Sequence, residues 1–158
     1  MKRPIVPGIA VVLALAAAGC GEKDESAASS TTTTALTKGQ FVRDANKICK
    51  TEGDKVERAS KQFFADAPPD KEASPAQIEK FGEKTVYPAI QSTIDRIKAL
   101  GAPTGDEDEV NQFLAALQAG LDKLKQDPQQ LARGGSAPAF EKADKLASDY
   151  GLDDCVGR

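Results

Sequence analysis

Apolar residues recur at helical spacing along most of this chain, and this periodicity is the feature that most limits its fold. The clearest stripe lies between Thr104 and Asp127 and consists of Val110, Phe113, Leu114, Leu117, Leu121 and Leu124. Three other segments carry similar stripes, and no segment shows the alternating β-branched pattern that is typical of a strand. Four amphipathic helices with short links predict an all-α fold, an up-down bundle of about four helices.

The first helix is expected from Lys38 to Asp66. Thr37 and Gln40 have the spacing of a capping box, in which two side chains satisfy backbone N–H groups at the start of a helix. The apolar stripe of this helix consists of Phe41, Ala45, Ile48, Val56, Ala59 and Phe63. Glu52 and Gly53 interrupt the middle of that stripe.

The second helix is expected to open with Ser74-Pro75, because Gln77 completes a second capping box and proline is favoured in a first turn. Gly101 ends it. Pro88 lies inside its apolar stripe and has no backbone N–H, so it should kink the helix or split it in two. The kink has two interpretations: it bends the helix around its core, or it opens a gap beside Tyr87 that admits a ligand.

The third helix is expected to start at Thr104, with Glu107 three residues later, and the fourth runs from about Pro138 to Tyr150. The acidic run Gly105–Glu109 could ligate calcium, but it lacks the further ligands of a calcium-binding loop. Acidic residues in a first turn also oppose the helix dipole, which explains the run without a metal. We therefore expect no metal ligand here.

Residues 1–19 have the order of an export signal and do not contribute to the fold. Lys2-Arg3 is the positive end, Ile5–Ala18 is the apolar run, and small residues precede Cys20. The uninterrupted apolar part, Ile9–Gly19, is shorter than the ~20 residues that a membrane-spanning helix needs. A cleaved signal therefore fits this segment better than a transmembrane helix.

The small residues before Cys20 also carry a resemblance. Ala17-Ala18-Gly19-Cys20 resembles the lipobox of bacterial lipoproteins, with Ala17 in place of the usual leucine. The resemblance implies that the Cys20 sulfur takes a diacylglyceryl group, with acyl chains such as palmitate, and that a peptidase cuts just before it. Two long chains would give stable attachment to the cell membrane on its extracytoplasmic face. The alternative is a secreted protein whose first mature residue is a cysteine.

This interpretation divides the chain into a signal peptide (1–19), a lipidated cysteine with a polar tether (20–36) and a helical bundle domain (37–158). The tether is small and polar, with too few apolar residues to order itself. Without Lys2-Arg3, 19 basic residues face 24 acidic ones, so the mature chain has a net charge of −5. This balance argues against a nucleic-acid partner. The expected partner is the lipid bilayer, which the lipobox resemblance implies is reached through acylated Cys20.

Three cysteines are present, and acylation of Cys20 leaves Cys49 and Cys155 as an even pair in an oxidising compartment. A bridge between them would close a loop of roughly 100 residues and stabilise the domain by about 4–5 kcal/mol in the chain-entropy model. It also requires the last helix to return beside the first, as in an up-down bundle. The alternatives are two free thiols or a bond between two chains.

A second, looser resemblance lies at the two ends of the domain. The segments "FVRDANKIC" (Phe41–Cys49) and "YGLDDC" (Tyr150–Cys155) resemble the paired cysteines of small lipoproteins from high-GC Gram-positive bacteria. The resemblance implies an extracytoplasmic, membrane-anchored protein. It supplies no catalytic residue.

The absence of histidine excludes Ser-His-Asp, Cys-His, zincin and haem-attachment sites, and no phosphate-binding loop or S-x-x-K pattern occurs. We therefore assign no catalytic residue, no metal ligand and no cofactor. The leading hypothesis is a binding module for an envelope protein or a small apolar ligand. The alternative is a carboxylate-based hydrolase of the glycosidase type, which needs two convergent carboxylates about 5–10 Å apart. No acidic cluster selects such a pair, because each is typical of a solvated helix face.

Overall fold

The computed structural model describes residues 36–65, 72–133 and 137–157, so the predicted signal peptide, Cys20 and all of the predicted tether except Leu36 lie outside the described residues. The predicted all-α fold is confirmed. Its main helices are α1 (Lys38–Phe63), α2 (Pro75–Phe81), α3 (Tyr87–Leu100), α4 (Glu107–Gln126) and α5 (Glu141–Tyr150). Shorter elements link or follow them: the π-helix η1 (Gly82–Val86) and the 3₁₀ turns η2 (Pro128–Arg133), η3 (Pro138–Phe140) and η4 (Asp153–Cys155).

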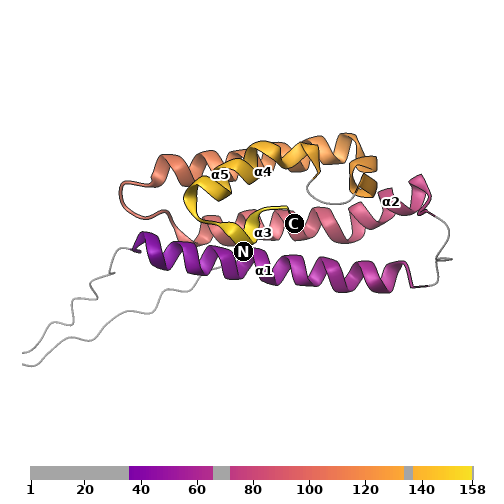
Figure 1. Cartoon of the computed structure of the whole chain (residues 1–158), viewed down its shortest axis with the longest axis horizontal. Coiled ribbons are helices and arrows are strands. Elements are labelled where there is room, and N and C mark those ends of the chain that lie inside the picture. The colour runs from indigo at the N-terminus through magenta and orange to yellow at the C-terminus, as the bar shows by residue number, and fades with distance from the viewer. Residues whose placement is uncertain (1–35, 66–71, 134–136, 158) are drawn as a thin grey trace, which may run out of the picture. The chain divides into compact units, whose positions relative to one another are not determined.

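The helices pack in chain order around one core (Figure 1). α1 lies along α3, α4 packs on α3, and α5 packs on α4. The chain then turns back, and η4 lies against α1. Because α2, η1 and α3 follow one another as a single bent helix, the arrangement is the predicted bundle of about four helices.

The bend in the second helix has a local cause at Pro88. In a regular α-helix the proline ring would clash with the backbone four residues earlier, and its nitrogen could not donate a hydrogen bond. The chain widens into a π-helix just before this point, and the Tyr87 N–H donates to the Gly82 carbonyl five residues back. A Cβ at position 82 would lie 2.9 Å from the Tyr87 ring, so Gly82 leaves room for that ring. The predicted kink is therefore confirmed.

Both predicted capping boxes are present. The Thr37 hydroxyl accepts from the Gln40 N–H at 3.3 Å, while the Gln40 side chain accepts from the Thr37 N–H at 3.0 Å. Ser74 and Gln77 make the same pair of bonds at 3.3 and 2.9 Å. Local side-chain chemistry therefore fixes where the first two helices begin. The sequence predicts that the first helix ends near Asp66, whereas α1 ends at Phe63.

The predicted start of the third helix at Thr104 is wrong, because α4 begins at Glu107. Gly105 has a φ of +91°, which is not helical, and the Glu107 carboxylate accepts from the Gly105 N–H at 2.7 Å. Asp106 precedes the helix without capping it. Its carboxylate instead accepts from the Tyr150 hydroxyl at 2.7 Å, so tertiary contacts set this helix start.

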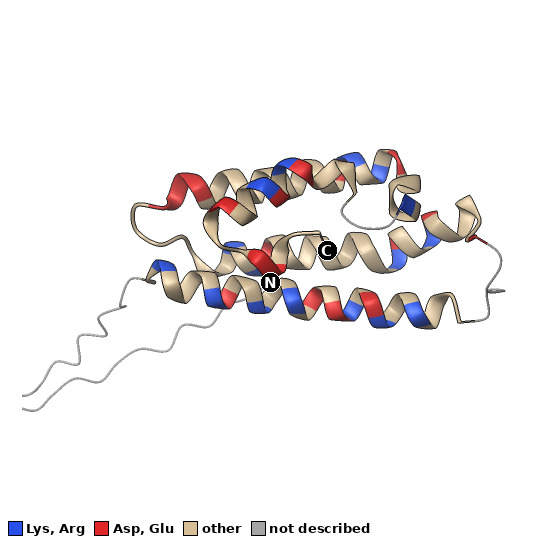
Figure 2. Ribbon diagram, in the orientation of Figure 1, with Lys and Arg blue, Asp and Glu red and all other residues tan. Residues whose placement is uncertain are grey.

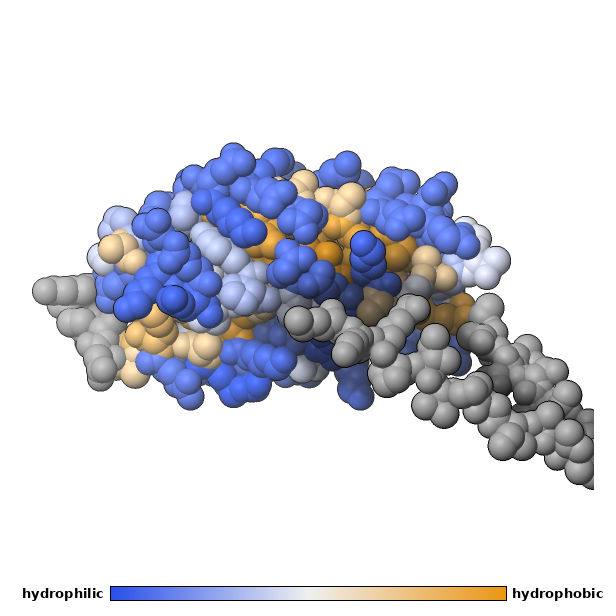
Figure 3. Space-filling model, turned by 180° about the vertical axis from the view of Figure 1, so that it is seen from behind, coloured by the Kyte–Doolittle hydropathy of each residue, from blue (hydrophilic) through white to orange (hydrophobic). Residues whose placement is uncertain are grey.

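The core lies between the inner faces of the helices, and charged residues of both signs are interspersed along the outer faces (Figure 2). Seen from behind, the domain shows an apolar band between hydrophilic side chains (Figure 3). The largest fully buried side chains are Phe41, Phe113, Ile97, Leu121, Leu124 and Leu152. Gly120 allows α5 to come close, because a Cβ at this position would lie 2.4 Å from the Phe140 ring.

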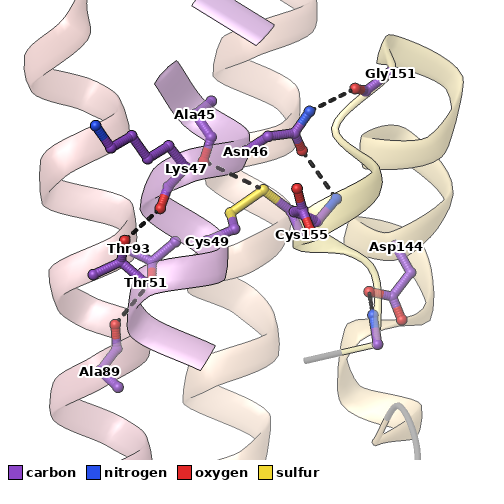
Figure 4. The surroundings of a disulfide bond; sticks show 12 residues. Ala45, Asn46, Lys47, Cys49, Thr51, Ala89, Thr93, Asp144, Gly151 and Cys155 are labelled. Carbon is purple, nitrogen blue, oxygen red and sulfur yellow. Dashed lines mark hydrogen bonds between the residues drawn. A yellow bond between two sulfur atoms is a disulfide. The ribbon is translucent and has the colours of Figure 1, made fainter. Parts of the chain in front are cut away.

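The predicted disulfide between Cys49 and Cys155 is present, with Cα atoms 5.0 Å apart (Figure 4). The Asn46 side chain reinforces it from one turn earlier on α1. Its Nδ2 donates to the Gly151 carbonyl at 3.1 Å, and its Oδ1 accepts from the Asp154 N–H at 2.9 Å. One covalent bond and two hydrogen bonds thus hold the C-terminal segment on α1.

We expect the double substitution Cys49→Ser and Cys155→Ser to lower the free energy of unfolding by about 2–5 kcal/mol, since the unfolded chain loses a large closed loop. Helical content should stay close to that of the parent, because the core holds the helices together without the bridge. Urea unfolding followed by circular dichroism, in the mature chain carrying Cys20→Ser, measures both quantities. Two reactive thiols per unreduced, denatured parent chain would contradict the assignment.

Candidate functional site

A groove of about 500 Å³ lies in the middle of the bundle. Its lining comes from α1, from the second helix on both sides of Pro88, from α4, and from the segments on either side of residues 134–136. We define the groove by its lining residues: Cys49, Glu52, Gly53, Val56, Glu57, Ser60, Lys61, Phe81, Val86, Ala89, Ile90, Thr93, Leu117, Leu124, Gln130, Leu131, Ala137, Phe140, Asp144 and Cys155.

The groove exists because the last helix is short. α1 has 26 residues and is therefore about 39 Å long, whereas the 10 residues of α5 span about 15 Å. α5 packs mainly on α4 and meets α1 at its last residue, where the Tyr150 and Phe41 ring centroids are 5.9 Å apart, and the short turn η4 then lies against α1. Much of α1 consequently faces a space that a longer fourth helix would fill.

The α1 side of the groove is a single helical face. Lining residues recur there every three or four positions from Cys49 to Lys61, which corresponds to a length of about 18 Å. The disulfide closes one end, and its cysteines are only 5% and 8% exposed. Phe81, which also lines the groove, packs with Phe63 and Phe64 near the C-terminal end of α1, with ring centroids 4.9–5.4 Å apart. The groove is therefore long and apolar in its middle, and the disulfide bounds one end.

Glu52 is the one charged residue buried within the described part of the chain, with 5% of its surface exposed. Its Oε1 accepts from Arg96 Nη1 at 2.6 Å and from Lys55 Nζ at 2.9 Å. Burial by itself raises the pKa of Glu52, but the hydrogen bonds and charges of Lys55 and Arg96 outweigh it and hold that pKa below the ordinary value. Glu52 is therefore ionised at neutral pH and already paired.

This electrostatic setting bears on the hydrolase alternative. A glycosidase acid needs a carboxyl whose pKa is raised so that it can donate a proton near neutral pH, and the pKa of Glu52 is shifted the other way. Glu57, a second lining carboxylate, is 64% exposed and lies 2.6 Å from Lys61 Nζ. Glu52 therefore does not have the electrostatic setting of a glycosidase acid.

Several features that were predicted from the sequence lie at the groove. Cys49 and Cys155, predicted to pair, form one of its ends. The kink at Pro88 had two interpretations, a bend around the core and a gap for a ligand, and Val86 and Ala89 line the groove on either side of it. Tyr87 itself is not part of the lining, and its hydroxyl donates to the Leu124 carbonyl at 3.4 Å.

Glu52 was missed by sequence reasoning, which treated it as an interruption of the apolar stripe. A signal was present, because Glu52 lies four residues after Ile48 and four before Val56, in phase with the buried face. A charged residue at such a position is costly unless it is paired. The partner could not be identified from sequence, since Arg96 is 44 residues away.

Known proteins give no further assignment for this site. A scan of protein-family models and searches of curated proteins and solved structures found no match for this chain. Across residues 36–65, 72–133 and 137–157, no cluster of three or more histidine, cysteine, aspartate or glutamate side chains could hold a metal ion. None of the helices in those ranges combines the length and apolar character needed to cross a membrane.

We expect Glu52→Gln to lower the free energy of unfolding at pH 7 by about 1–3 kcal/mol, because Lys55 and Arg96 lose the charged acceptor that they share. The pKa of Glu52 is lower in the folded state than in the unfolded state. The contribution of Glu52 to stability is therefore complete above the ordinary glutamate pKa of about 4.3 and is lost as the pH falls through the folded pKa. The difference from the parent should therefore shrink between pH 5 and pH 3 in urea unfolding.

The matched control is Glu57→Gln on the exposed face of the same helix, where an ion pair contributes only about 0–0.5 kcal/mol. Equal effects of the two substitutions would show that the burial of Glu52 has no energetic consequence.

Proposed function

We propose that this protein is a lipid-anchored, extracytoplasmic binding module whose groove holds a small apolar molecule. The observation that carries the proposal is the groove itself. Its volume of about 500 Å³ falls within the roughly 300–1,000 Å³ that is typical of small-molecule sites. Its middle is lined by aliphatic and aromatic side chains, and its buried carboxylate is already paired.

Two features support the extracytoplasmic placement. The lipobox-like Ala17-Ala18-Gly19-Cys20 follows an apolar run of signal length. The disulfide between Cys49 and Cys155 fits an oxidising compartment, where such bonds persist. In this proposal Cys20 attaches the chain to the outer face of the cell membrane, and the domain samples ligands beside it.

Filling the groove tests the binding site. Ala89 lies on α3 and lines the groove, so we expect Ala89→Trp to occupy it and to weaken binding of the neutral dye N-phenyl-1-naphthylamine at least tenfold. The measurement is dye fluorescence with the mature chain carrying Cys20→Ser. Ala99→Trp is the matched control, because Ala99 lies on the exposed side of the same helix and is outside the lining.

The control variant should bind the dye within about twofold of the parent. Equal binding by both tryptophan variants would place the dye elsewhere, and no binding by the parent would remove the support for an apolar ligand.

The anchor is tested separately at Cys20. In the native host we expect the parent to fractionate with membranes and Cys20→Ser to be released or to remain unprocessed, because the acyl chains supply the attachment. Membrane fractionation and the mass of the processed chain measure this. If Cys20→Ser is cleaved normally and still fractionates with membranes as fully as the parent, anchoring through this cysteine is wrong.

A further inference from the structure

We propose that the ligand in the groove is a single long aliphatic chain, of the kind carried by acyl lipids and other single-chain amphiphiles, lying lengthwise along α1. This inference rests on the proposed function and specifies its ligand class. Three observations carry it: the shape of the groove, the lack of free polar partners in its middle, and the pairing of its buried charge.

The shape favours an extended ligand. The lining on α1 continues for about 18 Å along one helical face. The opposite side is apolar over most of this length, since Ala89, Ile90, Leu117 and Leu124 face it from α3 and α4. A linear chain can contact this lining along its whole length, whereas a compact ring system would leave much of it uncovered.

The polar groups of the lining favour a hydrocarbon over a polar scaffold. Two polar side chains of the lining already have partners, since the Thr93 hydroxyl donates to the Ala89 carbonyl at 3.0 Å and Gln130 Oε1 accepts from the Ala139 N–H at 3.0 Å. A sugar, nucleotide or peptide would therefore find few new partners among them, and each polar group buried without one costs about 1–3 kcal/mol. A methylene chain carries no such cost.

The charges favour an uncharged ligand in the middle of the groove. The carboxylate of Glu52 is paired with Lys55 and Arg96, so it presents no uncompensated negative charge to a ligand. At the far end, Glu57 and Lys61 pair with each other. The Glu52 group carries one net positive charge, but Lys55 and Arg96 are 55% and 47% exposed and solvent screens them, whereas the Glu57–Lys61 pair is neutral. Chain length rather than head charge should therefore determine affinity.

The test is displacement of N-phenyl-1-naphthylamine from the mature chain carrying Cys20→Ser by straight-chain alcohols of 8 to 14 carbons. Each buried methylene should tighten binding about fourfold until the chain fills the groove, after which the gain should stop. A fatty acid and an alkyltrimethylammonium ion of equal chain length should bind within about threefold of the alcohol. Ala89→Trp should weaken binding of every chain, and Ala99→Trp should not.

Vesicles of phosphatidylglycerol and phosphatidylcholine distinguish the sources of the chain. Displacement by vesicles as well as by free alcohols identifies membrane lipids as a source, and displacement by alcohols alone identifies free amphiphiles. Affinity that is independent of chain length, or that changes more than tenfold with head charge, would overturn the inference while dye binding in the groove still supports the proposed function. Failure of the dye to bind the parent would instead overturn both.

Discussion

The bond between Cys49 and Cys155 is the contact that closes the bundle between the C-terminal segment and α1. α5 is too short to cover α1, so helix packing alone does not close the bundle along its whole length. The disulfide and the Asn46 hydrogen bonds close it with a short turn instead. A fourth helix as long as α1 would have sealed the interior, whereas this covalent closure leaves a groove beside it. The same bond therefore stabilises the domain and forms an end of the candidate site.

Features that depend on neighbouring residues were predictable from sequence. The capping boxes at Thr37 and Ser74 need only side chains three residues apart, and Pro88 distorts any helix that contains it. The disulfide was predictable for a different reason, since one cysteine expected to be acylated leaves a single pair. The apolar stripes then sufficed for the fold class.

Features that depend on distant residues were not predictable. Asp106 bonds to Tyr150 instead of capping a helix, so α4 begins three residues later than Thr104 suggested. The burial of Glu52 depends on Arg96, which only the packing of α1 on α3 brings near. The groove depends on the relative lengths of two helices, and no local pattern encodes such a difference.

The position of the disulfide also determines how the domain would bear a mechanical load. Tension applied at Leu36 enters α1 at its first turn and can unwind the helix only as far as Cys49, where it meets a covalent bond. From there the force passes directly to Cys155 and leaves through the last few residues. The residues between the two cysteines, which are 106 positions apart in the sequence and include the groove, therefore bear none of this force. A chain pulled at both ends would lengthen by little more than one short helical segment while its binding region stayed folded.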